Sequence, residues 1–377
     1  MSASPPSLLG TPVDLRDVEA EVRNQLRAAH RPELEPAQRV CMSNLVVFTD
    51  RVDTAERIAA QVPDIVAVHP ARVLLLVADP NATRDKVESS VLVRCRLLTK
   101  KQMACWEQIT LRAPTVHAER LTFAVRALLV GDLPTNLWWS STTPPPLAGY
   151  LLSELAESAQ QIMYDSIGWP QPALGVSATA SWLEETERCG ESGCYRVCSD
   201  LNWRRLKYWR RLVAQGLDWT VLSEAAQNEL LDEVLIEHGP HGVVQGWELA
   251  GWLAQRLGWK LVEGQSSDGV QMTWRFTAED GEVTVRLRRL PEGPPEILRL
   301  RMGCRLGNWS AGINVKREGD ERLAITLEGL PGEPRTMNLP PISPAELVGR
   351  QLSDRERDPV FRDSMTVAQQ MARCVIP

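Results

Sequence analysis

The pattern of hydrophobic and polar positions divides this chain into two parts with different sheet architectures. From about residue 40, compact apolar runs such as Leu45–Thr49 and Arg72–Ala78 alternate with helical periodicities. Continuous apolar runs of this kind are typical of strands that are covered on both faces. Beyond residue 260, apolar and polar residues alternate strictly, as in Val270–Thr277. That alternation predicts strands with one buried face and one face in water.

The first part is expected to form an α/β domain with a mixed sheet. The expected strands are Leu45–Thr49, Arg72–Ala78, Val91–Leu98, Cys105–Leu111, Asn136–Ser140 and, last in the domain, Gln161–Ser166. The expected helices are Thr54–Gln61, His117–Val130 and Leu147–Gln160. Gly131 follows the second helix and suits the left-handed position after a helix end.

The second part is expected to begin with an irregular junction, Pro170–Ser199, and two helices, Asn202–Gln215 and Gly246–Leu257. The alternating segments then predict an antiparallel meander that turns at Asp280-Gly281 and is followed by a helix from about Ser364 to Arg373. The fold class is therefore α/β plus α+β: an N-terminal mixed-sheet α/β domain, a helical junction and an antiparallel β-meander domain.

Three regions follow from these patterns: residues 1–39, 40–168 and 169–377. In the first region residues 1–12 look disordered, and Arg31–Ala37 reads as a linker. Between them lies a helix with four apolar residues on one face: Leu15, Val18, Val22 and Leu26.

Composition restricts the possible classes of function. Hydrophobic residues make up 44% of the 377 positions and charged residues 24%, as in ordinary globular proteins. No apolar run approaches the roughly 18 residues that span a bilayer, and the N-terminus lacks the features of a secretory signal. We therefore expect a cytoplasmic protein with no membrane partner. The net charge of −6 argues against nucleic acid as a partner.

The usual catalytic signatures are absent from the sequence. It contains no P-loop, no Gly-rich dinucleotide fingerprint, no nucleophile elbow and no HExxH motif. Among the five histidines, His238 and His241 could share a metal ion or simply lie in a solvated turn, and no neighbouring pattern completes a site. We expect no catalytic residue, no metal and no cofactor.

The eight cysteines are scattered in a chain that is too long to need disulfides, so most should be reduced and buried. Cys189, Cys194 and Cys198 lie close together beside two glycines. Their spacing matches no common zinc module. Incidental thiols, a redox-active pair and a metal site all remain open for this group.

Tryptophan is unusually common, with 13 residues against 4 Phe and 4 Tyr. In the segment Gly131–Trp139, turn-forming residues precede a strand that ends in Trp138-Trp139. Neighbouring strand residues point to opposite faces. Either helices cover both faces of this sheet, or one indole lies at an interface.

The segment Asp200–Trp209 begins with helix-capping residues. Its expected apolar face carries Leu206, Trp209, Val213 and Leu217, and Arg204, Lys207 and Arg211 line up nearly opposite. This stripe is either a solvated face or a docking site for an acidic partner or a phosphorylated ligand.

The wet face of the predicted meander adds a second set of arginines: Arg275, Arg286, Arg288, Arg299 and Arg301. The candidate partner-binding residues are Arg204, Arg205, Lys207, Arg211, Arg286, Arg288, Arg299 and Arg301. The candidate scaffold residues are Gly131, Asp132, Pro134, Asn136, Trp138, Trp139, Asp200, Asn202, Trp203 and Trp209.

Four segments in this order resemble the OpcA family of glucose-6-phosphate dehydrogenase assembly proteins. They are Ser43–Thr49, Gly131–Trp139, Asp200–Leu206 and Leu249–Trp259. The resemblance runs from roughly residue 15 to the C-terminus, and the tail Asp363–Arg373 is similar to the cyanobacterial branch.

The resemblance implies a two-domain, non-catalytic protein that binds glucose-6-phosphate dehydrogenase and promotes its active oligomer. That enzyme begins the oxidative pentose phosphate pathway and produces NADPH. Cyanobacterial relatives are associated with thiol-based control, but Cys189, Cys194 and Cys198 match no regulatory pair of the family. The other hypotheses are a sugar-phosphate-binding protein or enzyme of the same pathway, and a thiol redox sensor.

Overall fold

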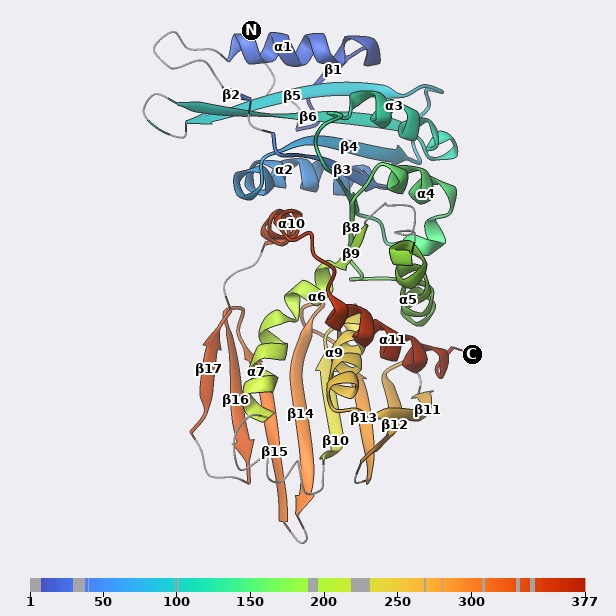
Figure 1. The fold of residues 1–377 in the computed structure, drawn as a ribbon, viewed down its shortest axis with the longest axis vertical. Coiled ribbons are helices and arrows are strands. Elements are labelled where there is room, and N and C mark those ends of the chain that lie inside the picture. Colours follow the sequence, from blue (N-terminus) through green and yellow to red (C-terminus); the bar gives the residue numbers. More distant parts are fainter. Residues whose placement is uncertain are drawn as a thin grey trace.

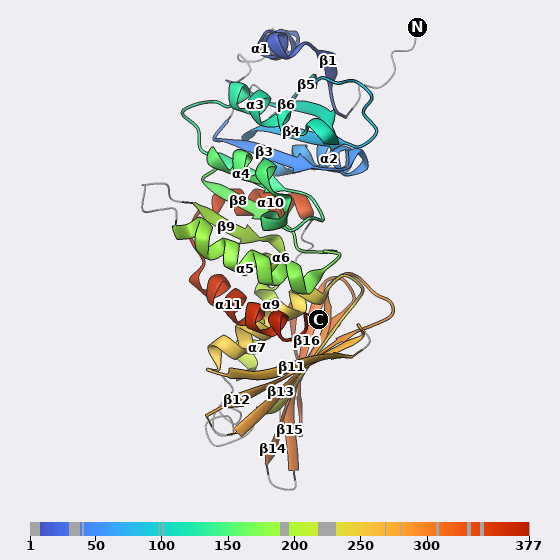
Figure 2. The same ribbon diagram turned by 90° about the vertical axis from the view of Figure 1, so that its right-hand side faces the viewer.

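The computed structural model describes residues 8–29, 38–39, 41–97, 99, 102–188, 196–217, 231–267, 269–279, 281–306, 309–329, 333–339 and 343–376. Two sheets lie toward opposite ends of the molecule, and helices fill the space between them (Figure 1). Figure 2 shows the same layering from the side, with α5, α6, α9 and α11 between the sheets. The predicted fold class is confirmed.

The first sheet has the strand order β1-β5-β6-β4-β3-β7-β8-β9, with β2 paired to β6. Its strands are β1 (Thr11–Val13), β2 (Gln38–Arg39), β3 (Ser43–Thr49), β4 (Ala71–Asp79), β5 (Glu88–Leu97), β6 (Met103–Pro114), β7 (Thr135–Trp139), β8 (Gln161–Tyr164) and β9 (Val197–Asp200). All neighbours from β6 to β9 are parallel, whereas β5 is antiparallel to β6. Leaving out β5, the parallel strands follow the order of a doubly wound dinucleotide-binding sheet.

Helices cover both faces of this sheet. They are α1 (Val18–Ala28), α2 (Val52–Val68), α3 (Arg120–Leu128), α4 (Tyr150–Glu157), α5 (Pro172–Arg188) and the 3-10 turns η1 (Leu15–Asp17), η2 (Thr115–His117) and η3 (Pro145–Ala148). The outer face of α2 is itself covered by α10 (Pro344–Ser353), which arrives from far along the sequence. Because apolar residues of β3 alternate between these two packed layers, the whole strand is buried.

The second sheet has the order β11-β12-β13-β10-β14-β15-β16-β17. Its strands are β10 (Leu231–His238), β11 (Lys260–Ser267), β12 (Gln271–Ala278), β13 (Gly281–Arg289), β14 (Ile297–Leu306), β15 (Trp309–Glu318), β16 (Arg322–Glu328) and β17 (Arg335–Asn338). The helices α6 (Leu201–Arg205), α7 (Lys207–Leu217), α9 (Val243–Arg256) and α11 (Pro359–Arg373) lie between it and the first sheet or on its buried face.

The structure corrects the predicted meander. The strand β10 enters the middle of the sheet, parallel to β13 and antiparallel to β14. Sequence reading overlooked it because only Val234 and Ile236 mark its apolar face between acidic neighbours. The pairs β12–β13, β14–β15 and β15–β16 are antiparallel, as predicted. The edge strands β11 and β17, which were not predicted, are antiparallel to β12 and β16.

Other predicted elements also need correction. Most of Pro170–Ser199 is not irregular, since the helix α5 occupies much of it, and β9 rather than β8 is the last strand of the first sheet. The expected helix Asn202–Gln215 is two helices that meet at Leu206. Residues 11–13 are ordered in β1. Arg31–Ala37 lies outside the described residues. The division into 1–39, 40–168 and 169–377 stays a prediction, and the first sheet extends to Asp200.

Gly131 does not adopt the left-handed conformation that its place after a helix suggested. The helix α3 ends at Leu128, and Leu129 is already extended with φ −65° and ψ 142°. Gly131 has no positive φ, and a Cβ placed there meets nothing within 4 Å. Nothing in its surroundings requires a glycine.

We therefore expect Gly131→Ala to change the free energy of unfolding by less than about 1 kcal/mol, with a small gain from the lower entropy of the unfolded chain. A urea titration followed by tryptophan fluorescence measures it. A loss well beyond that range would mean that this loop needs glycine for another reason.

Candidate functional site

The segment Asp200–Trp209 leads from the carboxyl end of β9 into the space between the two sheets. The Asp200 carboxylate caps α6, since its Oδ1 accepts hydrogen bonds from the Asn202 amide at 2.8 Å and the Ser166 amide at 3.2 Å. The Asn202 side chain donates to Ser166 Oγ at 2.8 Å. The capping predicted for Asp200 is confirmed, and the cap also joins the ends of β8 and β9.

Arg205 is fixed by a bidentate ion pair in the same cluster. Its two terminal nitrogens lie 2.9 and 2.8 Å from the carboxylate oxygens of Asp165, and it also donates to Asn202 Oδ1 at 3.0 Å. Burial opposes the charged form of Arg205, but the Asp165 carboxylate outweighs it and raises the pKa of the guanidinium. The charge of Arg205 is therefore already paired with an acidic side chain of the same chain.

Two buried carboxyl groups meet at the centre of the junction. Glu248, on α9, is fully buried close to Asp200, and its two carboxyl oxygens have no hydrogen-bond partner among the described residues. Burial, and then the charge of Asp165, raises the pKa of Asp200 to about 7. Burial, and then the charge of Asp200, raises the pKa of Glu248 well above its ordinary value. Burial and like charge therefore both favour the protonated forms of these two carboxyl groups.

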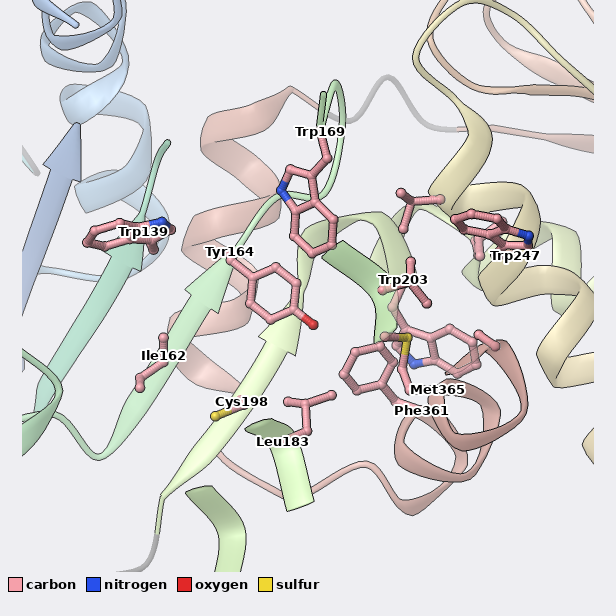
Figure 3. Close-up of a cluster of buried hydrophobic side chains, with 14 of the residues drawn as sticks. Trp139, Ile162, Tyr164, Trp169, Leu183, Cys198, Trp203, Trp247, Phe361 and Met365 are labelled. Carbon is pink, nitrogen blue, oxygen red and sulfur yellow. The ribbon is translucent and has the colours of Figure 1, made fainter. Parts of the chain in front are cut away.

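A buried tyrosine adjoins this pair. Tyr164, at the end of β8, lies 5.9 Å from Trp169 between ring centroids in the cluster of Figure 3. Its hydroxyl has no hydrogen-bond partner among the described residues. Burial, and then the nearby charge of Asp200, raises the pKa of this phenol well above its usual range. The tyrosine therefore remains neutral.

Trp203 connects the segment to the last helix of the chain. Its ring lies 5.4 Å from Phe361 of α11 between centroids (Figure 3), and its Nε1 donates to Asp358 at 2.7 Å. The Arg210 guanidinium stacks on the Trp203 ring, with its carbon 3.4 Å from the ring centroid. Trp209 is buried among the side chains of the core.

The residues of the predicted basic stripe differ in their surroundings. Arg204 donates to Gln351 Oε1 at 2.7 Å and to Asp354 Oδ2 at 2.6 Å. Lys207 and Arg211 are exposed. Only these two residues of the stripe therefore present their charges to solvent.

The arginines on the wet face of the second sheet are interleaved with glutamates. Arg286 pairs with Glu233, Arg288 and Arg299 with Glu237, and Arg301 with Glu328 at 2.7 Å. Arg275 lies 3.1 Å from Glu263. The five arginines are thus matched by acidic neighbours along the strands, and the face is a mixed-charge ladder. The sequence did not predict these ion pairs, because the paired glutamates come from other strands: β10, β11 and β16.

The segment Gly131–Trp139 is held against β3 by asparagine side chains. The Asn44 side chain of β3 bonds the backbone of Val130 at 3.0 Å in both directions, and Asn136 Nδ2 donates to the Asn44 carbonyl at 3.3 Å. The Pro134 carbonyl accepts from the Asn44 amide at 2.8 Å. Asp132 is exposed at the loop tip. Asparagines therefore hold this loop against β3.

Both indoles of Trp138-Trp139 are buried, on opposite faces. Trp139 stacks on Phe48 with 4.3 Å between ring centroids, and its Nε1 donates to the Thr143 carbonyl at 2.9 Å. Trp138 packs in the layer of α2 and α10. Of the two alternatives left by the sequence, the sheet covered on both faces is confirmed.

Cys198 is buried on β9, whereas Cys189 and Cys194 lie outside the described residues. Cys95 and Cys105 face each other on β5 and β6 and form a disulfide, an exception to the expectation of reduced cysteines. His238 is buried at the end of β10, and His241 lies in a turn with φ 70°. Within the described ranges, no three His, Cys, Asp or Glu side chains gather as metal ligands. No helix there is long and apolar enough to cross a membrane.

The turn that would hold a dinucleotide in a doubly wound sheet does not fit one. Such a turn follows the first parallel strand and needs glycines so that the backbone can approach a pyrophosphate. Here Asp50 and Arg51 follow β3, and Asp53 lies in the first turn of α2, where a second anion would be repelled. Ser141 Oγ, after β7, donates to Asp50 Oδ2 at 2.6 Å and so joins the ends of β3 and β7. We therefore assign no dinucleotide to this site.

Two family models match the chain in succession. The model described as the glucose-6-phosphate dehydrogenase subunit N-terminal domain, OpcA_G6PD_assem, matches residues 62–181. The C-terminal domain model of the same family, OpcA_G6PD_C, matches residues 196–365. The chain belongs to the OpcA family.

Curated cyanobacterial OpcA relatives agree with the assignment. A "putative OxPP cycle protein OpcA" of Nostoc punctiforme is 32% identical over 209 residues, 55% of this chain and 42% of that protein. The protein of the same name from Synechococcus elongatus is 28% identical over 240 residues, 62% of this chain and 51% of that protein. The chain thus matches about half the length of these OpcA relatives.

Solved structures resemble the OpcA chain only loosely. An oxidoreductase from Sinorhizobium meliloti has a TM-score of 0.49 at 12% identity, covering 90% of this chain and 96% of that one. The transcriptional regulator Gal80p from Kluyveromyces lactis has a TM-score of 0.48 at 9% identity, covering 90% and 93%. Likenesses at this level have no bearing on activity.

Several residues of the site were not found from the sequence: Tyr164, Asp165, Arg210 and Glu248. One signal was present for Glu248, which is the only acidic residue in the mostly apolar helix α9. A charge in such a helix marks a buried polar contact. The other three become recognisable only once the ends of β8 and β9 lie side by side.

Proposed function

We propose that this OpcA-family protein is a non-catalytic partner of glucose-6-phosphate dehydrogenase that binds the enzyme and promotes its assembly or activation in the oxidative pentose phosphate pathway. The observation that carries the proposal is the ordered match of both family domain models along one chain. The turn after β3, which has no glycine and whose Asp50 accepts a hydrogen bond from Ser141, supports a binding role over dinucleotide chemistry.

The mechanism is thermodynamic linkage. A protein that binds the assembled enzyme more tightly than its separate subunits shifts the assembly equilibrium by that difference in affinity. The contacts that join the segment Asp200–Trp209 to α10 and α11 suit this role, because a rigid surface loses little conformational entropy on binding.

The first contact candidate is the exposed pair Lys207 and Arg211 on α7. Both charges face solvent, whereas Arg204, Arg205 and the five arginines of the mixed-charge ladder already pair with acidic side chains of the chain. A second surface is apolar. Phe123 on α3 and Tyr150 on α4 are 65% and 66% exposed. They flank the ion pair between Arg126 and Glu154.

We expect the purified protein to increase both the activity and the oligomer size of its cognate dehydrogenase. The double change Lys207→Glu and Arg211→Glu should weaken this effect about tenfold or more, because it places two like charges against an acidic partner surface. Initial rates and light scattering after gel filtration measure both quantities.

A matched control reverses two other exposed lysines, Lys260→Glu and Lys316→Glu, which should leave activation unchanged. If the α7 variant activates normally and Phe123→Asp with Tyr150→Asp does not, the contact lies on α3 and α4. If the unaltered protein changes neither rate, substrate affinity nor oligomer size, the proposed function is wrong.

A further inference from the structure

A cavity of about 360 Å³ opens where the two halves of the molecule meet. Its walls come from the end of β9, the helices α6 and α7, the last turn of α10 and the first turn of α11. We call it the junction cavity. Its charged lining residues are Asp200, Arg204, Lys207, Arg210, Asp354, Glu356, Arg357 and Asp358.

Arg210 is the distinctive cation of this lining. Its guanidinium is stacked on Trp203, and its Nη1 donates to the Trp203 carbonyl at 2.8 Å. Within the described part of the chain, no carboxylate lies within ion-pair distance of it, unlike Arg204 and Arg205. Burial lowers the pKa of Arg210 to about 10, against the raising effect of Glu248 and Asp358 at longer range. An anion in the cavity would supply the missing counter-charge.

A second cavity, of about 420 Å³, is lined by Arg205, Tyr208 and Arg317, among others. It offers no comparable group, because Arg205 pairs with Asp165 and Arg317 pairs with Glu296. The junction cavity is therefore the better candidate for binding an anion.

The remaining lining of the junction cavity suits hydroxyl groups. Ser199 and Glu356 contribute a hydroxyl and a carboxylate group to the wall, and Lys207 is exposed beside them. The Gln351 amide is already bonded to Arg204, Ser199 and the Asp354 carbonyl. Carboxylates and amides accept hydrogen bonds from hydroxyl groups, while arginine bonds phosphate or carboxylate oxygens in pairs. A volume of this size holds a small metabolite.

We propose that the junction cavity binds a small polyhydroxylated anion, a sugar phosphate in chemical class, with its anionic group on Arg210 and Lys207 and its hydroxyl groups toward the carboxylates of the wall. Binding there would connect β9, α10 and α11, the elements that join the two sheets. The ligand would thus stabilise one arrangement of the two halves.

Isothermal titration calorimetry on the full chain, without any dehydrogenase, tests this proposal, with glucose 6-phosphate, inorganic phosphate and glucose as probes. We expect glucose 6-phosphate to bind more tightly than inorganic phosphate and glucose to bind least. Arg210→Met keeps an apolar stem on Trp203 but removes the charge, and should weaken binding of the sugar phosphate at least about tenfold.

Arg211→Met is the matched control, because it removes the same charge from the neighbouring exposed position and should leave binding unchanged. If Arg210→Met does not fold, Lys207→Met at the rim is measured instead and should weaken binding severalfold. No binding of glucose 6-phosphate, or equal binding by Arg210→Met, overturns the proposal. Inorganic phosphate that binds as tightly as glucose 6-phosphate overturns the recognition of hydroxyl groups. Because no enzyme is present, these failures leave the proposed function untouched.

Discussion

Asp200→Asn should stabilise the protein at pH 8 and flatten the dependence of its stability on pH. Asp200 ionises at a pKa of about 7 in the folded chain and near 3.8 in the unfolded one. Between these values the folded state holds the extra proton. The contribution of Asp200 to the free energy of unfolding is therefore fully present below about pH 4. It is lost as the pH rises through 7.

The difference between the folded and unfolded pKa values of Asp200 corresponds to about 1.4 kcal/mol for each pH unit. The ionised group therefore lowers the free energy of unfolding by roughly 4 kcal/mol at pH 8. Asparagine keeps the oxygen that caps α6 and can donate from its amide to Glu248. Because Glu248 stays in place, we expect the variant to recover about half, roughly 2 kcal/mol. Urea unfolding at pH 5, 6, 7 and 8 gives the slope directly.

Asp165→Asn is the matched control for that experiment. It removes a carboxylate from the same cluster but breaks the bidentate pair with Arg205, so it should destabilise the protein at every pH tested. An Asp200→Asn variant with the slope of the unaltered protein would mean that folding does not raise the pKa of Asp200.

Gly251→Ala should destabilise the protein by about 2 kcal/mol, even though alanine favours helices over glycine. A Cβ at this position of α9 would lie 2.4 Å from the backbone oxygen of Ser364 in α11, so one of the two helices must move. The helix α11 packs on α9, on α5 and beside β11. Moving it therefore loosens the connection between the two sheets.

Gly246→Ala, on the same helix, is the control. Its Cβ would meet only the end of the Leu287 side chain, which can turn aside, so we expect a smaller loss. Urea midpoints and near-ultraviolet circular dichroism are the measurements, since Trp274 Nε1 donates to the Met371 carbonyl of α11 at 2.9 Å. Equal losses in the two variants would mean that the approach of α11 to Gly251 does not limit the packing.

Most of the fold could be predicted from local patterns in the sequence. The buried strands β3 and β4 and the alternating strands β12 and β13 were predicted, because burial on one or two faces leaves a direct trace in residue order. The strand β10 and the helix α5 were missed. Their apolar positions are few, and their stability depends on neighbours that are distant in sequence.

The candidate site was less predictable for a related reason. Sequence alone selected Asp200, Arg204 and Trp203, since capping and helical spacing are local properties. It could not say that Arg204 meets Asp354, or that Glu248 meets Asp200, because these contacts join residues about 150 and 48 positions apart. Pairing of this kind also explains why the arginines of the second sheet form a mixed-charge ladder and not a basic surface.

The packing of α10 against α2 has a consequence for the order in which the protein can be completed during synthesis. Leu347, Val348 and Leu352 cover the layer that includes Ile58 and Ile65. A ribosome adding roughly 5 to 20 residues per second needs on the order of tens of seconds to travel from α2 to α10. Once β9 has been made, the first sheet has all its strands but lacks the part of its cover that α10 supplies. The nascent chain therefore carries an exposed apolar surface that chaperones can bind until translation is almost finished.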